Sequence, residues 1–142
     1  PFVDEMVGID RLDAVLGLAD FVINALPFTA ATRHLLGANE LAAMKSSAFL
    51  INIGRGATGD ESALIDALEN GIIAGAGLDV FEEEPLPPSS PLWKMPNVLI
   101  TSHYSGATPR YHERAHDIFL DNLRRYQNGQ PLRNVVDKQR GY

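Results

Sequence analysis

Four short apolar runs recur along the chain, and proline, glycine or a polar residue stops each one. Continuous apolarity over a few residues is typical of a parallel strand that is covered on both faces. The pattern therefore predicts four buried strands, at residues 21–26, 48–53, 73–80 and 97–101.

The segments between these runs predict helices. Apolar residues at helical spacing indicate short helices at residues 9–18 and 39–44, and a third from Asp60, which can cap it, to Gly71, which can end it. Thr108-Pro109 has the form of a hydroxyl cap followed by proline at the first helical position, so a long helix is expected from Thr108 to Gln127. The polar tail, residues 131–142, is expected to be irregular.

The alternation of strands and helices predicts an open α/β sheet with parallel strands and helices on both faces. In such sheets, ligands bind in a crevice beyond the carboxyl ends of the strands. The residues that follow each predicted strand are therefore the first candidates for chemistry.

Composition narrows the class of protein. The chain has 142 residues, 45% hydrophobic and 21% charged, which suits one globular domain. Its net charge of −6 and pI of about 5.1 do not favour a nucleic-acid partner. No apolar run is long enough for a membrane helix, so no membrane partner is expected.

The chain has no cysteine, which excludes disulfides, thiolate metal sites and cysteine nucleophiles, and fits a cytoplasmic protein. No signal peptide is visible at the start of the chain. The sequence begins at Pro1 without a methionine, which suggests a piece of a longer protein.

Arg55 follows the second predicted strand and lies between Gly54 and Gly56. Glycine lets the backbone approach a ligand closely, and a guanidinium binds a carboxylate through two parallel hydrogen bonds. Arg55 is therefore a candidate for holding an acidic substrate; a structural or surface role is the alternative.

His103 follows the fourth predicted strand and can move a proton near neutral pH. A carboxylate on its other ring nitrogen would make it a better acid, and either Asp79 or Glu84 could supply one. Taken alone, His103 reads as an ordinary surface or core histidine, and the acidic run around Glu84 as a solvated loop. His112 and His116 have i, i+4 spacing but no third ligand nearby, so no metal site is expected.

Four segments, in this order and spacing, resemble the D-isomer-specific 2-hydroxyacid dehydrogenases, and the resemblance covers nearly the whole chain. The segments are 19–27 with Thr29 and Thr32; 44–45 and 50–56 with Asp60, Ala63 and Leu64; 74–86; and 91–93 with 96–103. Two positions depart from the family pattern: Tyr104-Ser105-Gly106 stands after His103 where many members are glycine-rich, and Gly59 stands where an apolar residue is common.

The resemblance implies the C-terminal part of a Rossmann-like, doubly wound parallel sheet. Residues 1–106 would form the C-terminal portion of a dinucleotide-binding domain. Residues 107–142 would be a helix and tail leading back to a substrate domain that is mostly absent. The family also implies NAD or NADP as cofactor, a small 2-oxo or 2-hydroxy acid such as glyoxylate or hydroxypyruvate as substrate, and a homodimer of the full-length protein.

The resemblance further implies roles for single residues. His103 would be the acid/base group assisted by Glu84, and Arg55 would orient the substrate carboxylate. Asp79 would meet the nicotinamide end of the cofactor, although it could simply cap its strand. The residues implied to contact the cofactor are Leu26, Pro27, Thr32, Ile53, Gly54, Arg55, Asp79, His103, Ser105 and Gly106.

The chain contains no Gly-x-Gly-x-x-Gly phosphate-binding turn, which the family carries upstream of these segments. The choice between NAD and NADP therefore stays open, and the 142-residue chain alone is expected to be inactive. Two alternatives to the enzyme remain: a dinucleotide-sensing, non-enzymatic module of the corepressor type, and an inactive half of a former enzyme.

Overall fold

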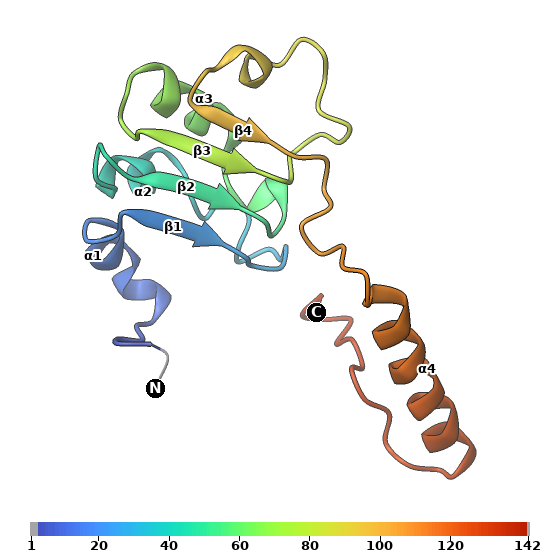
Figure 1. Ribbon diagram of the computed structural model, residues 1–142. Helices are drawn as coiled ribbons and strands as arrows, with labels where there is room; N and C mark the ends of the chain where they lie inside the picture. Colours follow the sequence, from blue (N-terminus) through green and yellow to red (C-terminus); the bar gives the residue numbers. More distant parts are fainter. Residues whose placement is uncertain (1–2, 142) are drawn as a thin grey trace. The chain divides into compact units, whose positions relative to one another are not determined.

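A computed structural model describes residues 3–141, which divide into two compact units at His103 and Tyr104 (Figure 1). The first unit carries a sheet and three α-helices, and the second carries one long helix and a tail. The two are described separately. The predicted boundary after residue 106 lies close to this division, but assignment of the second unit to a substrate domain stays a prediction.

All four predicted strands are present and parallel, in the order β1 (Phe21–Asn24), β2 (Phe49–Asn52), β3 (Gly75–Leu78) and β4 (Val98–Ile100). Each is shorter than its apolar run. At the end of β1, for example, the Asn24 side chain accepts a hydrogen bond from the Leu26 backbone N–H at 3.2 Å, so the chain turns away from the ladder. The register aligns Asn24 with Asn52, and Asn52 with Leu78, which brings the strand ends to one edge.

Helices α1 (Leu12–Leu16), α2 (Ala38–Ala43) and α3 (Glu61–Glu69) pack against one another along one face of the sheet (Figure 1). Their apolar side chains form a core with the inward-facing side chains of the strands. This core includes Leu16, Leu41, Leu50, Leu64, Leu68 and Leu78. Helices were predicted on both faces, and among the described residues of this unit they cover only this face. The opposite face of this unit exposes Phe21, Ile23, Phe49 and Leu99.

Asp60 caps α3 as predicted: its carboxylate accepts a hydrogen bond from the Ala63 N–H at 3.0 Å. Gly71, just beyond the helix end, has a φ of +65°, a conformation that favours glycine. Two 3-10 turns were not predicted from the sequence, η2 (Gly56–Thr58) and η3 (Pro91–Lys94). The first predicted helix is a 3-10 turn, η1 (Ile9–Arg11), followed by one α-helical turn and a half.

In the second unit, helix α4 runs from Tyr111 to Gln127. The predicted start at Thr108 was wrong, because the Thr108 carbonyl instead closes a turn by accepting from the Tyr111 N–H at 3.0 Å. Residues 131–141 contain no helix or strand, as expected. Among residues 3–141, no helix combines the length and apolarity needed to cross a bilayer.

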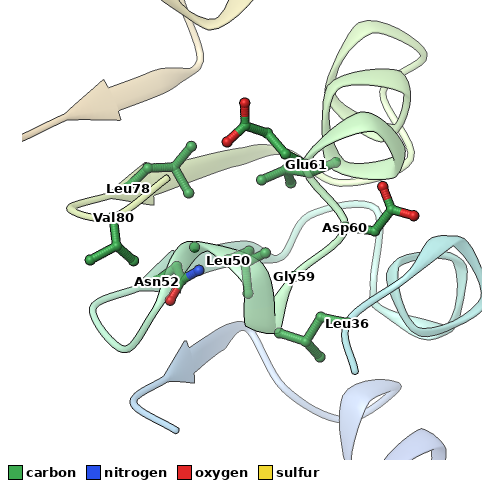
Figure 2. Close-up of a pocket in the computed structure, with 10 residues that line it drawn as sticks. Leu36, Leu50, Asn52, Gly59, Asp60, Glu61, Leu78 and Val80 are labelled. Atoms are coloured by element: carbon green, nitrogen blue, oxygen red, sulfur yellow. The ribbon is translucent and has the colours of Figure 1, made fainter. Parts of the chain in front are cut away.

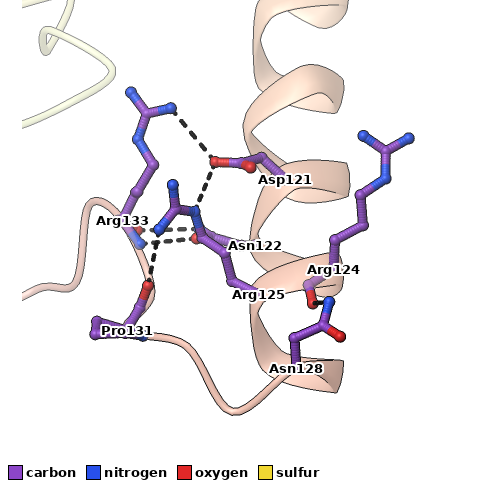
Figure 3. Close-up of polar contacts among 7 residues, drawn as sticks. All are labelled: Asp121, Asn122, Arg124, Arg125, Asn128, Pro131 and Arg133. Atoms are coloured by element: carbon purple, nitrogen blue, oxygen red, sulfur yellow. Dashed lines mark hydrogen bonds and ion pairs between the residues drawn. The ribbon is translucent and has the colours of Figure 1, made fainter.

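Side chains of α4 hold the tail in place (Figure 3). The Asn122 amide exchanges two hydrogen bonds with the Arg133 backbone, at 2.8 and 3.0 Å. Asp121 lies 2.9 Å from Arg125 and 3.3 Å from Arg133. The hydrogen bond from Arg125 lowers the pKa of the Asp121 carboxyl below its ordinary value, and Arg133 acts in the same direction.

Candidate active site

The ends of the four parallel strands place the predicted chemical groups at one edge of the sheet. Arg55 lies just after β2, Asp79 immediately after β3, and His103 shortly after β4. Glu84 lies on the loop that follows β3. This arrangement follows from the parallel direction of the strands, because the carboxyl ends of parallel strands lie at the same edge of the sheet.

His103 and Glu84 form a close pair: Nδ1 of the imidazole lies 2.7 Å from Oε2 of the carboxylate. The other carboxylate oxygen, Oε1, accepts a hydrogen bond from the Phe81 N–H at 2.9 Å. Partial burial raises the pKa of Glu84. The hydrogen bonds from His103 and Phe81, and the positive charges of His103 and Arg55, outweigh burial and leave that pKa below its ordinary value.

The backbone at His103 is in the left-handed region, with a φ of +54°. This conformation is uncommon for a residue other than glycine and persists only where the surroundings hold it. The imidazole is about half exposed, at 46% of its side-chain surface. With Nδ1 on the carboxylate, Nε2 is the ring nitrogen that can meet a ligand.

Arg55 is held through its backbone while its side chain is exposed. The Arg55 carbonyl accepts a 2.6 Å hydrogen bond from the hydroxyl of Thr58, a residue with 0% exposure. Its guanidinium donates to the Gly54 carbonyl at 2.7 Å. The charge of Arg55 also acts on Glu84, so the two side chains belong to one electrostatic environment.

Asp79 is 3% exposed and accepts a short hydrogen bond from the Thr101 hydroxyl, which joins the ends of β3 and β4. Its backbone N–H donates to the Asn52 carbonyl at 3.0 Å. This position suits the strand-capping alternative. It also leaves Asp79 at the edge where a cofactor contact was expected.

The residues expected to contact the cofactor lie mainly on the loops after β1 and β2. Leu26 and Ile53 expose 38% and 42% of their surfaces, so they offer apolar area at this edge. Gly54 lies close to the Leu26 backbone: a Cβ at Gly54 would sit 2.6 Å from the Leu26 carbonyl oxygen. The Thr32 hydroxyl donates to the Pro27 carbonyl at 2.7 Å and so holds the first loop in its turn.

These residues fit one end of a dinucleotide. Exposed apolar side chains at the same edge of the sheet as a His–Glu pair suit a flat ring that carries the reacting carbon, whereas the phosphate-binding turn is not in this sequence. Ser105 and Gly106 belong to the second unit, so their expected contact with the cofactor stays a prediction.

Sequence reasoning missed the polar groups beneath the site. Asn24 and Asn52 are 4% and 6% exposed, and each accepts a hydrogen bond from the backbone N–H two residues later. The signal that could have found them is an asparagine at the same place in two apolar runs, Ile23-Asn24 and Ile51-Asn52. Such a residue has to be hydrogen-bonded when it is buried.

Residues 2–105 match the family model described as D-isomer specific 2-hydroxyacid dehydrogenase, NAD binding domain. The chain is 50% identical over 131 residues to glyoxylate/hydroxypyruvate reductase B of Pectobacterium atrosepticum, covering 90% of this chain and 40% of that protein. The same protein of Salmonella gallinarum matches equally, at 50% over 131 residues. The chain thus spans about two fifths of the length of these curated relatives.

Two solved structures are similar over nearly all of the chain. One is a D-isomer specific 2-hydroxyacid dehydrogenase from Xanthobacter autotrophicus in complex with NADPH and MES, with a TM-score of 0.88 and 44% identity, covering 95% of this chain and 55% of that one. The other is an NADPH-dependent glyoxylate/hydroxypyruvate reductase from Sinorhizobium meliloti with NADP and sulfate. It has a TM-score of 0.89 and 37% identity, covering 97% of this chain and 45% of that one.

Proposed function

We propose that this chain, which belongs to the D-isomer specific 2-hydroxyacid dehydrogenases, is the catalytic part of a 2-oxo acid reductase. The part of the family that it matches is the NAD binding domain. The substrate would be a small 2-oxo acid such as glyoxylate or hydroxypyruvate, which are named in similar proteins. The 2.7 Å contact between His103 and Glu84 carries the proposal, because it orients an imidazole at the edge of the sheet where ligands bind.

The reduction adds a hydride to C2 of the acid and a proton to its carbonyl oxygen. A nicotinamide cofactor, when bound, would supply the hydride. His103 supplies the proton from Nε2, while Glu84 holds Nδ1 and so fixes the orientation of the ring. The product is the 2-hydroxy acid, and His103 regains its proton from solvent.

Arg55 would bind the substrate carboxylate, since a guanidinium can hold both oxygens and so fix the orientation of the neighbouring carbonyl. The side chain has to leave the Gly54 carbonyl to do so with all of its donors. Leu26, Pro27, Thr32, Ile53 and Gly54 would line the nicotinamide end, with Asp79 beside it.

NADP(H) is the preferred cofactor in this proposal, because two similar solved structures contain it. A homodimer of the full-length protein and a cytoplasmic location stay predictions. So does the inactivity of the 142-residue chain alone, which turnover of glyoxylate by that chain would contradict.

A substrate panel on the full-length protein, with NADH and NADPH in parallel, tests the proposal. His103→Ala should abolish most turnover, and His116→Ala, on the surface of α4, should not. Arg55→Ala should raise KM and lower kcat, whereas exposed Arg33→Ala should leave both unchanged. Unchanged rates in the His103 or Arg55 variant would overturn the assignment. Binding of NADPH without turnover of any 2-oxo acid would favour the dinucleotide sensor instead.

A further inference from the structure

Two glutamates outside the candidate catalytic set exchange hydrogen bonds between helix α3 and the loop that carries Glu84. The Glu61 N–H donates to Oε1 of Glu82 at 3.0 Å, and the Glu82 N–H donates to Oε2 of Glu61 at 3.1 Å. The residues are 21 positions apart in sequence. The pair therefore fixes one segment of the loop to the first turn of the helix.

The Glu61 carboxylate is not needed as a cap of its own helix. Asp60 already caps α3 through the Ala63 N–H, and the Glu61 N–H is satisfied by Glu82. The acceptor oxygen of Glu61 instead serves a donor outside the helix. This hydrogen bond joins the loop to the helix.

The loop segment that Glu61 holds is the one that orients Glu84. The Phe81 N–H, one residue before the Glu82 N–H, donates to Oε1 of Glu84 at 2.9 Å. The second oxygen of Glu84 faces Nδ1 of His103. The Phe81 N–H lies in the adjoining Val80–Phe81 peptide, so movement of the Phe81–Glu82 peptide would shift Phe81 and change the position of the carboxylate that holds the imidazole.

The same peptide lies against the loop that carries Arg55. A Cβ at Gly56 would sit 1.9 Å from the carbonyl carbon and oxygen of Phe81, and 2.5 Å from the Glu82 nitrogen. Only glycine permits this approach of two backbones. Gly56 and Glu61 also line the small cavity of about 20 Å³ at the start of α3. Figure 2 labels Glu61 at this cavity.

Charges near the pair are compatible with two neighbouring carboxylates. The amino end of α3 carries partial positive charge. Nε2 of His34 lies 3.1 Å from Oε1 of Glu82, although the ring is not aligned for a hydrogen bond. This contact ties the loop after β1 to the same point.

We propose that Glu61 is a positioning residue for the His103–Glu84 pair, acting through the Glu82 N–H and the Phe81–Glu82 peptide. Only the expected effect on turnover rests on the proposed function. The contacts themselves can be tested in the 142-residue chain without cofactor or substrate.

Two substitutions at Glu61 separate the effect of side-chain length from the effect of charge. Glu61→Asp keeps the charge but shortens the side chain by one methylene, so the carboxylate loses the Glu82 N–H. Glu61→Gln loses the charge but keeps the reach and an acceptor oxygen. Glu69→Asp, on the exposed end of the same helix, is the matched control.

Carbon-detected NMR titration of the Glu84 carboxyl and amide hydrogen exchange at Glu82 provide the readouts. In Glu61→Asp, we expect the Glu84 pKa to rise toward its ordinary value and the Glu82 amide to exchange faster. Glu61→Gln and Glu69→Asp should show neither change. The proposal would be overturned if Glu61→Asp and Glu61→Gln gave the same Glu84 pKa and the same Glu82 exchange rate. The exchange measurement is independent of the carboxyl titration.

Turnover of the full-length protein provides the second arm. Glu61→Asp should lower kcat by about tenfold with little change in KM, because the reacting pair is misplaced rather than removed. An altered Glu84 titration with unchanged kcat would contradict a positioning role. A wild-type protein with no turnover would instead count against the proposed function, and the NMR arm would still decide on Glu61.

Discussion

Asn24 and Thr58 are joined by a buried hydrogen bond of 2.6 Å, from the amide Nδ2 at the end of β1 to the hydroxyl Oγ1 in the turn after β2. The same hydroxyl donates to the Arg55 carbonyl at 2.6 Å. One side chain that is fully buried thus links the ends of two strands to the backbone of the predicted carboxylate-binding arginine.

Thr58→Val should destabilise the protein by about 1–3 kcal/mol, because it keeps the shape but leaves the Asn24 amide without its partner. The loss is measured as a lower free energy of unfolding in urea. Thr58→Ser retains the hydroxyl and should lose clearly less. Equal stability of the valine variant and the wild type would show that the hydrogen bond contributes nothing net.

Gly59→Ala should stabilise the protein by about 0.4–1 kcal/mol, since alanine restricts the unfolded chain and fits the folded one. The backbone at Gly59 is extended, with a φ of −106°, and a Cβ there would lie 3.8 Å from the nearest atom, the Leu36 carbonyl oxygen. Figure 2 shows Gly59 beside the cavity at the start of α3.

Gly54→Ala is the opposing control for this stability measurement. Its Cβ would sit 2.6 Å from the Leu26 carbonyl oxygen, so the backbone has to shift and the free energy of unfolding should fall. A destabilised Gly59→Ala would show that this turn needs glycine for a reason other than space.

Glu84 should make stability fall as the solution becomes acidic. Its pKa in the folded protein is below the ordinary value. The stabilisation is therefore complete above the unfolded pKa and is lost as pH falls through the folded one. In Glu84→Gln, the melting temperature should depend less on pH over this range, whereas exposed Glu83→Gln should keep the wild-type profile. Identical acid profiles for the wild type and Glu84→Gln would contradict the assignment.

Asp121 should hold the tail to α4 at neutral pH and release it as the pH falls. Its carboxylate contacts Arg125 and Arg133 and has a lowered pKa, so the contact is present at neutral pH and is lost on acidification. In Asp121→Asn, we expect the Arg133 amide to exchange faster at neutral pH. Asp117→Asn, one turn earlier on the helix, should leave that exchange unchanged.

Sequence patterns predicted the elements whose determinants are local. Each strand lies within a predicted apolar run, and α3 begins after a capping aspartate and ends before a glycine. The start of α4 was misplaced because a Thr-Pro pair fits both a helix start and the turn that precedes one. Whether the Thr108 carbonyl closes a turn depends on the path of the chain before it.

The residues of the candidate site were predicted, and so was one of its pairings. The position of the residues along the chain left both Asp79 and Glu84 as possible companions of His103, whereas the family resemblance implied Glu84. The structure pairs His103 with Glu84, while Asp79 is buried against Thr101. The Glu61–Glu82 exchange could not be predicted, because it joins residues that only the fold brings together, and an acidic run is usually solvated.

The backbone contact of Gly56 with Phe81 and Glu82 also bears on how this sequence can change in length. Loops usually tolerate inserted residues because they are exposed and loosely packed. Here, two loops after neighbouring strands lie backbone to backbone, so one residue added to either would displace the other. We therefore expect insertions and deletions to be excluded from residues 54–60 and 79–84.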